Sequence, residues 1–581
     1  GTAERVITFG QRAKAATKPA PTPLADMLAK FDFEATIELA ANGSPLAGSP
    51  VSARTLLAAT TDAALAAETA GGGVQSRYWT QGPICTTVIL GDHVTKKYDL
   101  GTNATKAIRP LFHVQFWPTI GRYHVRHIIE IADVTKLRDE PGLTVGFTTS
   151  GRHDLGLMPK WDVVAMYSGA AHMHAIGESQ AELFGSWAFF FREGDPQKTT
   201  IDQAPGVGRV VSKLSRPTVY LGDGNAQIAT GAAGDRFTCD GVLDPKRDGW
   251  VHDSAHTPGA FWWQYVSTGQ AFWHEKLLHM AAWSQFLVNP GLAYNSVGNG
   301  GAATALIING VQVRGWGWQF RNRARAWWAA LDGSPERALF ERSLTDAVAQ
   351  RAGLYDVPGS MPDNPIRAAW NANHASWYAG NPPTPRPNRL AFWDRKGPYS
   401  EQQLTGAIKS PPPDDWGGGA TAPWMQNYVT LSINHAVELG FEPARPLADW
   451  CGALEIAIAN SPEPRHLGDY CIPQTKNDGT FYQSLDDLFD GYAHDADGES
   501  PPAMRKDSAA GFSAAGAPST YAVSVEGYGS IAAAAIAMGN GAPGQLQAWK
   551  VVEPWFRATR FHDHDPRYAI VPRAVPAAAP R

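Results

Sequence analysis

The chain is poor in charged side chains and has no long uninterrupted apolar segment. Charged residues make up 18% of its 581 residues, and its formal net charge is -5. A protein that follows a phosphate backbone normally carries a basic stripe or patch, whereas the Arg and Lys residues here are dispersed. The apolar segment at 531–538 is far shorter than the roughly 20 residues that a membrane-spanning helix needs. The composition therefore argues against nucleic-acid binding and against a membrane-embedded protein.

Cysteine is also scarce, and its four positions are Cys85, Cys239, Cys451 and Cys471. No Cys-x-x-Cys pair occurs among them, so neither a structural zinc site nor a redox dithiol is suggested. A disulfide between Cys451 and Cys471 and a pair of buried free thiols fit the sequence equally well. The start Gly1-Thr2-Ala3 fits a processed mature form, and with the glycan hypothesis below we expect a secreted or periplasmic protein.

Tryptophan, in contrast, is abundant, with 21 residues. Flat aromatic faces suit sugar rings, because they combine a large contact area with a polar edge. Burial in a core is the expected role of any single Trp, but the whole set exceeds what core packing leads us to expect. We infer a glycan cleft lined by Trp residues near loops or helix starts, namely Trp316, Trp318, Trp377, Trp393 and Trp424.

The length implies about two to four domains, and the hydrophobic pattern changes near residue 220. Short segments of period two predict antiparallel strands at Ile84–Leu90, Leu111–Trp117, Tyr123–Val134, Leu143–Thr149, Asp162–Tyr167 and Trp187–Arg192. Strands without convincing helices between them predict a sandwich of two antiparallel sheets over 1–220. Leu56–Ala67 fits either a helix or an irregular connection.

A linker at 221–254 is followed by the helical spacing of three and four residues. The predicted helices are Gln270–Leu287, Trp318–Leu331, Pro335–Arg351, Pro423–Leu439, Pro446–Asn460, Ser519–Met538 and Pro543–Phe556. Ser334 and Pro335 suit a helix start, and Gly440 suits a helix end. Antiparallel pairs of this kind stack into bundles, solenoids or toroids. We predict an α+β multidomain fold with an (α/α) toroid at 255–581, whose long loops at 353–420 and 461–518 wall a cleft.

This architecture resembles polysaccharide lyases and glycoside hydrolases that combine a β-sandwich with an (α/α) barrel. The resemblance rests on the segments Asp253-Ser-Ala-His256-Thr-Pro258, Tyr265-Val-Ser-Thr-Gly269 and Arg314-Gly-Trp-Gly-Trp318-Gln-Phe-Arg321. The segment 477–492 is similar to the part of chondroitin and hyaluronan lyases that supplies a catalytic Tyr, here Tyr492. It has Ser484 where a catalytic His follows the Gln in those enzymes.

A lyase acting on a uronate must neutralise the carboxylate, remove the adjacent proton with Tyr or His, and protonate the departing oxygen. If 368–378 is helical, Asn371, His374 and Tyr378 share one face. A packed aromatic helix with a hydrogen-bonded His fits this spacing equally well. On a second predicted helix, Tyr428 and His435 share a face at seven-residue spacing, for which structural hydrogen bonding is again the competing explanation.

These arguments select two groups of residues. The candidate catalytic residues are His374, Tyr492, Asn373, Asn371, Tyr378 and His256. The candidate substrate-binding residues are Arg314 and Arg321, which suit a carboxylate clamp, and Trp316, Trp318, Trp377, Trp424, Tyr428, His435 and Tyr482.

A metal site is considered at His252, Asp253 and His256, because imidazole and carboxylate at short spacing suit zinc or manganese. Substrate contacts and local caps explain these residues more simply, and no second ligand cluster accompanies them. We therefore predict no cofactor, and a divalent metal remains an unsupported option.

Three function classes follow, all with a polysaccharide or oligosaccharide partner. The first is a lyase that cleaves a uronate-containing glycan by β-elimination. The second is a glycoside hydrolase, which needs two carboxylates beside the scissile bond. Asp and Glu residues are available for it, but none are paired by a defensible spacing. The third is a non-catalytic glycan-binding protein. The particular glycan, endo or exo action and the oligomeric state stay open.

Overall fold

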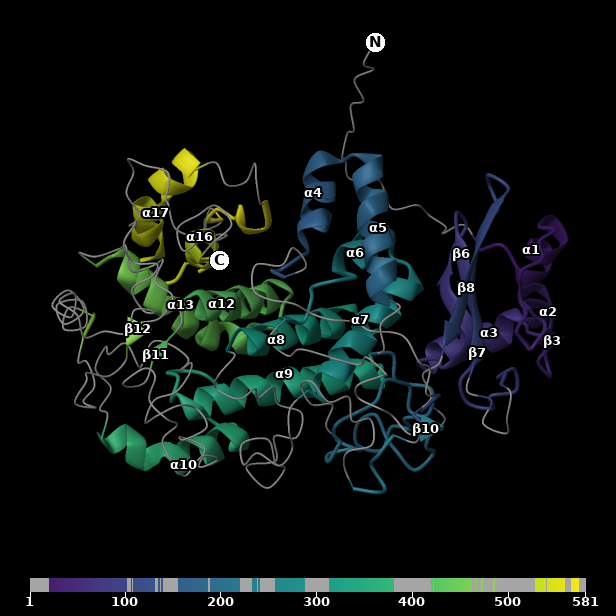
Figure 1. Cartoon of the computed structure of the whole chain (residues 1–581), viewed down its shortest axis with the longest axis horizontal. Helices are drawn as coiled ribbons and strands as arrows, with labels where there is room; N and C mark the ends of the chain where they lie inside the picture. Colours follow the sequence, from purple (N-terminus) through teal and green to yellow (C-terminus); the bar gives the residue numbers. More distant parts are fainter. Residues whose placement is uncertain are drawn as a thin grey trace, which may run out of the picture. The chain divides into compact units, whose positions relative to one another are not determined.

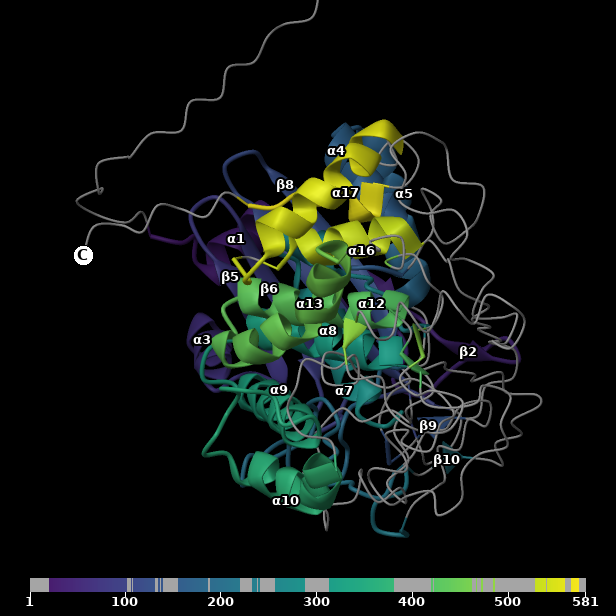
Figure 2. The same ribbon diagram turned by 90° about the vertical axis from the view of Figure 1, so that its left-hand side faces the viewer.

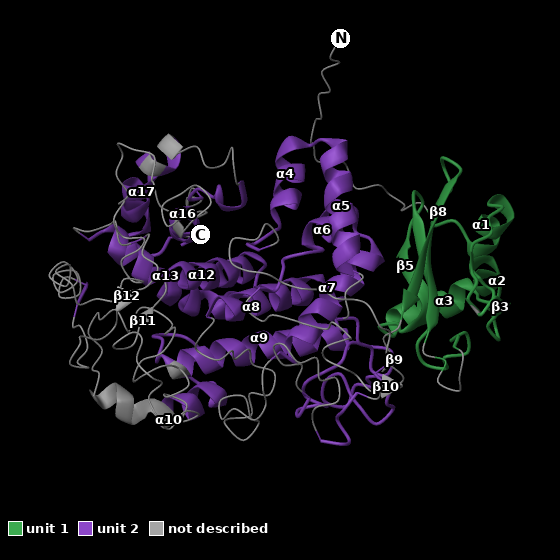
Figure 3. Cartoon of the chain, in the orientation of Figure 1, with its two compact units in different colours: residues 1–130 green, residues 131–581 purple. Residues whose placement is uncertain are grey.

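The structure is a computed structural model that describes residues 20–101, 106, 108–130, 134–135, 137–138, 155–185, 189–219, 232–237, 239–240, 256–287, 313–380, 420–421, 423–461, 467, 472–473, 484–485, 528–539, 541–559 and 566–573. The chain divides into two compact units, 1–130 and 131–581 (Figure 3). The division therefore falls after Glu130, whereas the sequence pattern placed it near residue 220. The fold mixes helices with small, mostly antiparallel sheets.

Unit 1 is built on a four-stranded antiparallel sheet in the order β5-β6-β7-β8 (Figure 1). Its strands are β5 (Gln75–Gln81), β6 (Thr86–Asp92), β7 (Arg109–Trp117) and β8 (Arg122–Glu130). The helices are α1 (Leu24–Lys30), α2 (Ala53–Ala58) and α3 (Asp62–Ala70), and the short strands are β1 (Thr36–Ile37), β2 (Ala40–Ala41), β3 (Ser44–Pro45) and β4 (Val51–Ser52). The predicted strands Ile84–Leu90 and Leu111–Trp117 are confirmed as β6 and β7, and the predicted strand Tyr123–Val134 is confirmed as β8 as far as Glu130.

The core of unit 1 lies between one face of this sheet and the helices α1 to α3. Alternate residues of β6 and β7 pair across the strands on that face, as Val88 does with Val114 and Leu90 with Phe112, and they form one cluster with Leu57 of α2. The described part of unit 1 thus holds one large sheet covered by helices, and a second stacked sheet is not found in it. The segment 56–67 is helical except at 59–61, where α2 ends and α3 has not yet begun, and each helix begins at a side-chain cap.

Unit 2 is mainly helical. Its helices are α4 (Lys160–Ser168), α5 (Ala171–Gly185), α6 (Trp262–Thr268), α7 (Ala271–Ser284), α8 (Val313–Ala329), α9 (Pro335–Leu354), α10 (Pro365–Gly380), α12 (Pro423–Glu438), η3 (Glu442–Ala444), α13 (Arg445–Ala459), α16 (Tyr528–Ala537), α17 (Gln545–Thr559) and η9 (Pro566–Tyr568). Two short strand pairs accompany them: β9 (Leu137–Arg138) with β10 (Cys239–Asp240), and β11 (Ala420–Thr421) with β12 (Ile472–Pro473).

Most of the predicted helices are confirmed, but one predicted strand is wrong. Asp162–Tyr167 lies in helix α4, which has the acidic Asp162 in its first turn and ends at the left-handed Gly169. An acidic first turn and a glycine at the end are helix signals, and here they outweigh the apparent alternation. Within the predicted strand Trp187–Arg192, the described residues form only an isolated bridge from Arg192 to Val210. The predicted strand Leu143–Thr149 lies outside the described residues.

Three helical hairpins, α8–α9, α12–α13 and α16–α17, stack on one another (Figures 1 and 2). Within the stack α12 contacts both α8 and α16, while α13 contacts both α9 and α17. The hydroxyl of Ser334 caps α9, with Pro335 at its start, and Gly440, with φ +100°, follows α12, as expected. Among the described helices, none has both the length and the apolar character needed to cross a membrane.

Helices α8 and α12 run parallel, because Arg314 lies over Trp424 near their starts and Arg325 bonds His435 near their ends. Gly317 permits their close approach. A Cβ at this position would lie 3.1 Å from the Cα of Val429, which is tighter than ordinary van der Waals contact.

Candidate functional site

Helix α8 is polar, yet it is almost completely buried. Arg314, Arg321, Arg323 and Arg325 lie along it, and none is more than 7% exposed. Burial of a guanidinium is costly unless its N–H groups find acceptors. The partners of these arginines therefore reveal what α8 organises.

Helix α8 holds the segment 256–259 in place. This segment begins at His256, one of the three residues considered above for a metal site. Each residue of this segment accepts a hydrogen bond from α8: His256 Nε2 from Arg314 at 3.1 Å, Thr257 O from Arg321 at 2.8 Å, Pro258 O from Asn322 at 3.3 Å, and Gly259 O from Arg325 at 3.1 Å. Two of the segments that carried the family resemblance are thus in direct contact. Arg321 acts as a support for this loop rather than as an open carboxylate clamp.

A second loop lies against the first. Arg321 and Arg325 also donate to the carbonyl oxygens of Gly156 and Leu157. A Cβ on Gly259 would approach the Leu157 oxygen to 3.0 Å, so a larger residue would push the two loops apart. The arginines of α8 therefore position both loops together.

The loop that carries His256 ends in strained backbone. Phe261 has φ +71° and ψ -18°, a left-handed conformation that is rare for a bulky residue. Its side chain is fully buried and stacks on Trp273 at 6.2 Å between ring centroids. Strain of this kind persists only where the surroundings enforce it, and it concentrates at functional sites.

Aromatic rings extend the site from Arg314. The Arg314 guanidinium lies 4.9 Å from the Trp424 ring centroid, and Trp424 meets the edge of Tyr428 at 6.3 Å. The Tyr428 hydroxyl accepts a hydrogen bond from Tyr568 at 3.3 Å. We call His256, Arg314, Trp424, Tyr428 and Tyr568 the Arg314 cluster.

The Arg314 cluster contains both a proton acceptor and a proton donor. Burial, followed by the neighbouring Tyr568, raises the pKa of Tyr428 well above its usual value, against the opposing effect of Arg567 and Arg314. The phenol therefore stays protonated and suits a proton donor. His256 Nε2 faces a guanidinium, which can only donate, so this nitrogen carries no proton.

His435 supports the site from α12. Its Nε2 accepts a hydrogen bond from Arg325 at 3.1 Å, and burial followed by Arg325 lowers its pKa well below the usual value. A neutral His435 thus holds the arginine that bonds the Gly259 carbonyl. Its role is to position the loop.

The structure brings seven of the sequence-predicted residues into this one region. They are His256, Arg314, Trp318, Arg321, Trp424, Tyr428 and His435. Trp316 is also on α8, but it is fully buried and stacks on Phe320 at 4.8 Å. The sequence argument missed Arg325, whose spacing from Arg314 and Arg321 would have placed it on the same helix face. It also missed Tyr568, for which no local pattern exists.

The predicted helix over 368–378 is confirmed as part of α10. Asn371 donates to Asp356 Oδ1 at 3.4 Å, which is a local structural contact. The side chains of Asn373, His374, Trp377 and Tyr378, and the residues Tyr482 and Tyr492, lie outside the described residues. Their predicted roles remain predictions.

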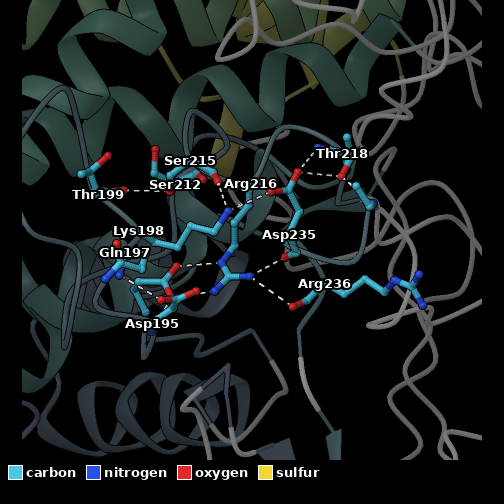
Figure 4. A network of polar contacts seen from close by, with 12 residues as sticks. Asp195, Gln197, Lys198, Thr199, Ser212, Ser215, Arg216, Thr218, Asp235 and Arg236 are labelled. Carbon is cyan, nitrogen blue, oxygen red and sulfur yellow. Dashed lines mark hydrogen bonds and ion pairs between the residues drawn. The ribbon is translucent and has the colours of Figure 1, made fainter.

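A second polar network lies in the irregular segments 189–219 and 232–237 (Figure 4). Arg216 forms two hydrogen bonds of 2.7 Å to the Glu193 carboxylate, and Lys198 pairs with Asp235 at 2.9 Å. Asp235 in turn accepts from Thr218. These charges pair with one another, so the network joins loops rather than forming a reactive site.

The described residues contain no group of three metal-ligating side chains, while His252 and Asp253 lie outside them. Cys451 is a buried free thiol, and Cys471 lies outside the described residues. No protein-family model matches the chain, and neither a curated protein nor a solved structure matches it.

Proposed function

We propose that unit 2 is the catalytic domain of a polysaccharide-degrading enzyme that cleaves a uronate-containing glycan by β-elimination. The observation that carries this proposal is the Arg314 cluster. It combines a cation, an unprotonated imidazole nitrogen and a protonated phenol pair in one place. These are the groups that β-elimination next to a carboxylate requires.

In this proposal Arg314 pairs with the uronate carboxylate and makes the neighbouring C5 proton acidic. His256 takes that proton on Nε2, from which the substrate displaces the hydrogen bond of Arg314. The C4–O bond breaks as the C4=C5 double bond forms, and the Tyr428–Tyr568 pair protonates the departing oxygen. Trp424, which is buried, packs against the Arg314 guanidinium and orients it.

The proposal also includes the finer architecture, an (α/α) toroid. Its support is the stack of three hairpins, in which α8, α12 and α16 form one layer and α9, α13 and α17 form the next. A toroid needs such an alternation of inner and outer helices. A polymeric glycan substrate fits a secreted or periplasmic enzyme.

The test is ultraviolet absorbance during incubation with a panel of uronate polysaccharides, because only β-elimination leaves a conjugated double bond. We expect His256→Gln to lower turnover by about 10²- to 10⁴-fold, as loss of a proton-transfer group does. The matched control is His127→Gln, which replaces an exposed histidine of β8 and should leave turnover unchanged. New reducing ends without absorbance would instead select a hydrolase, and binding without cleavage would select a glycan-binding protein.

The same assay tests the other predicted catalytic residues. We expect His374→Ala and Tyr492→Phe each to remove most turnover while the melting temperature stays nearly constant. Unchanged turnover in either variant would remove that residue from the mechanism and leave the Arg314 cluster as the sole candidate.

A further inference from the structure

The α4–α5 hairpin meets α6 through one buried carboxyl group. Asp162, in the first turn of α4, is 1% exposed. Its Oδ1 accepts a hydrogen bond of 2.7 Å from Gln264 Nε2 of α6. The same Nε2 donates to the carbonyl oxygen of Gly177 in α5 at 3.2 Å. A single amide group thus joins three helices.

The backbone of α5 is shaped to receive this carboxyl. A Cβ on Gly177 would lie 2.8 Å from Asp162 Oδ1, a separation that real Cβ atoms do not tolerate. Glycine at this position therefore lets the carboxyl lie against the helix backbone.

Two polar side-chain atoms at this contact are buried without satisfied hydrogen bonds among the described residues. Asp162 Oδ2 and Gln264 Oε1 are both buried, and among the described residues neither has a hydrogen-bond partner. Buried atoms of this kind are costly unless they are satisfied. A proton on Oδ2 would satisfy both, because the O–H could donate to Oε1 while Nε2 continues to donate to Oδ1.

Burial favours this protonation, whereas the nearby charge of Arg325 opposes it. The charged or titratable groups on the elements packed here are Lys160 and Tyr167 on α4, His172, His174, Glu178 and Glu182 on α5, Tyr265 on α6, His274, Glu275, Lys276 and His279 on α7, Arg567 and Tyr568 on η9, Arg321 and Arg325 on α8, and His435 on α12. Burial is the largest effect and raises the pKa of Asp162 to about 7, against the opposing effects of Gln264 and Arg325.

We propose that Asp162 and Gln264 form a carboxylic acid–amide pair that holds the α4–α5 hairpin against α6 and loosens it when the carboxyl ionises. The ionised form has no proton to offer Gln264 Oε1, and it places a charge in the helix contact. The pair is therefore a pH-sensitive contact between helices, and we call it the latch. It does not depend on the proposed glycan chemistry.

The latch is connected to the segment that carries His256 through Arg321 and Arg325. Helix α4 starts directly after the loop whose Gly156 and Leu157 carbonyls are held by Arg321 and Arg325, and those arginines also hold the 256–259 segment. Loosening α4 thus reaches the loop that carries His256. Alkaline conditions are expected to increase the mobility of both loops.

The sign of the pH dependence follows from the raised pKa. The stabilising contribution of the pair is fully present below the usual Asp value of 3.8 and is lost as the pH rises through about 7. Asp162→Asn keeps the shape and supplies a permanent N–H donor for Gln264 Oε1. It mimics the protonated acid at every pH.

The experiment compares the melting temperature of the full chain and of Asp162→Asn between about pH 5 and pH 8. We expect the variant to gain on the order of 2 to 6 °C relative to the wild type as the pH rises. Asp235→Asn is the matched control, because the pKa of Asp235 is lowered, chiefly by Thr218 and Lys198 against burial. Its difference from the wild type should stay constant over this window. A constant difference for Asp162→Asn would overturn the proposal.

Hydrogen exchange of the wild type provides a second measurement that needs no variant. After correction for intrinsic exchange rates, amides of α4 and α5 should lose protection as the pH rises through about 7, whereas those of α9 should not. Equal behaviour of α4, α5 and α9 would overturn the latch, even if the Asp162→Asn variant failed to fold.

Discussion

Unit 1 and unit 2 each bury an arginine, but they balance its charge differently. In the sheet of unit 1, Arg109 donates two hydrogen bonds, of 2.9 and 2.8 Å, to the carboxylate of Asp99. In α8 of unit 2, Arg325 donates to the carbonyls of Leu157 and Gly259 and to His435. Among the described residues no carboxylate lies within ion-pair distance of Arg325.

The difference lies in how each unit accommodates a buried guanidinium. Arg109 and Asp99 neutralise each other, as a structural ion pair does. Burial, followed by the nearby Arg321, lowers the pKa of Arg325 well below its usual value, against the opposing effect of Asp162.

The largest expected loss of stability follows from replacing Arg109, the arginine that is paired with a carboxylate. Arg109→Leu leaves Asp99 buried without its partner, which should cost about 3 to 5 kcal/mol of unfolding free energy. Urea denaturation followed by circular dichroism measures this loss.

The double variant Arg109→Leu/Asp99→Leu is the control for that prediction. It removes both charges and should recover most of the stability. If the double variant is as unstable as the single one, loss of packing rather than an uncompensated charge explains the result.

Arg325→Lys should lower the free energy of unfolding by about 1 to 3 kcal/mol, which is less than the loss expected for Arg109→Leu. A lysine keeps the charge but loses the planar fork that reaches two loop carbonyls and His435 at once. Thermal unfolding measures the loss, and proteolysis near residues 157 and 259 should increase. Unchanged stability would show that the loops are held by other contacts.

Lys213 is a titratable counterpart of Arg325. It is 3% exposed, its Nζ donates to the Val219 carbonyl at 2.5 Å, and burial lowers its pKa to about 7. Its stabilising contribution is therefore lost as the pH falls through about 7. We expect the free energy of unfolding of Lys213→Met to exceed that of the wild type by about 1 to 2 kcal/mol near pH 6, and by less near pH 9. A difference that does not change with pH would refute the buried cation.

The smallest effect concerns the contact between α8 and α12 that brings Arg325 to His435. Gly317→Ala should lower the free energy of unfolding by about 1 kcal/mol, because the added Cβ meets backbone atoms of Tyr428 and Val429. Gly452→Ala in α13 is the matched control. Its Cβ would meet only Thr430 Cγ2 at 3.6 Å, so the better helix propensity of Ala should keep it neutral or stabilising. Equal effects of the two variants on stability would show that the close packing of α8 against α12 does not require a glycine at position 317.

Periodicity and capping residues predicted much of the local structure. Ser334 and Pro335 mark the start of α9 as expected, and Gly440 follows α12. The same reasoning failed at Asp162–Tyr167, because a six-residue segment satisfies both periods. In the folded protein Asp162, Val163 and Ala165 are buried on a helix, a face that alternation alone does not identify.

The sequence by itself determined where most helices after residue 270 form and which segments carry Arg, Trp and His, since those properties depend on neighbours a few residues apart. Only the tertiary structure decided that His256 meets Arg314, 58 residues away, and that Tyr568 meets Tyr428 across 140 residues. Such contacts arise because buried donors must find acceptors wherever the packing of helices presents them. No local pattern encodes that choice of partner.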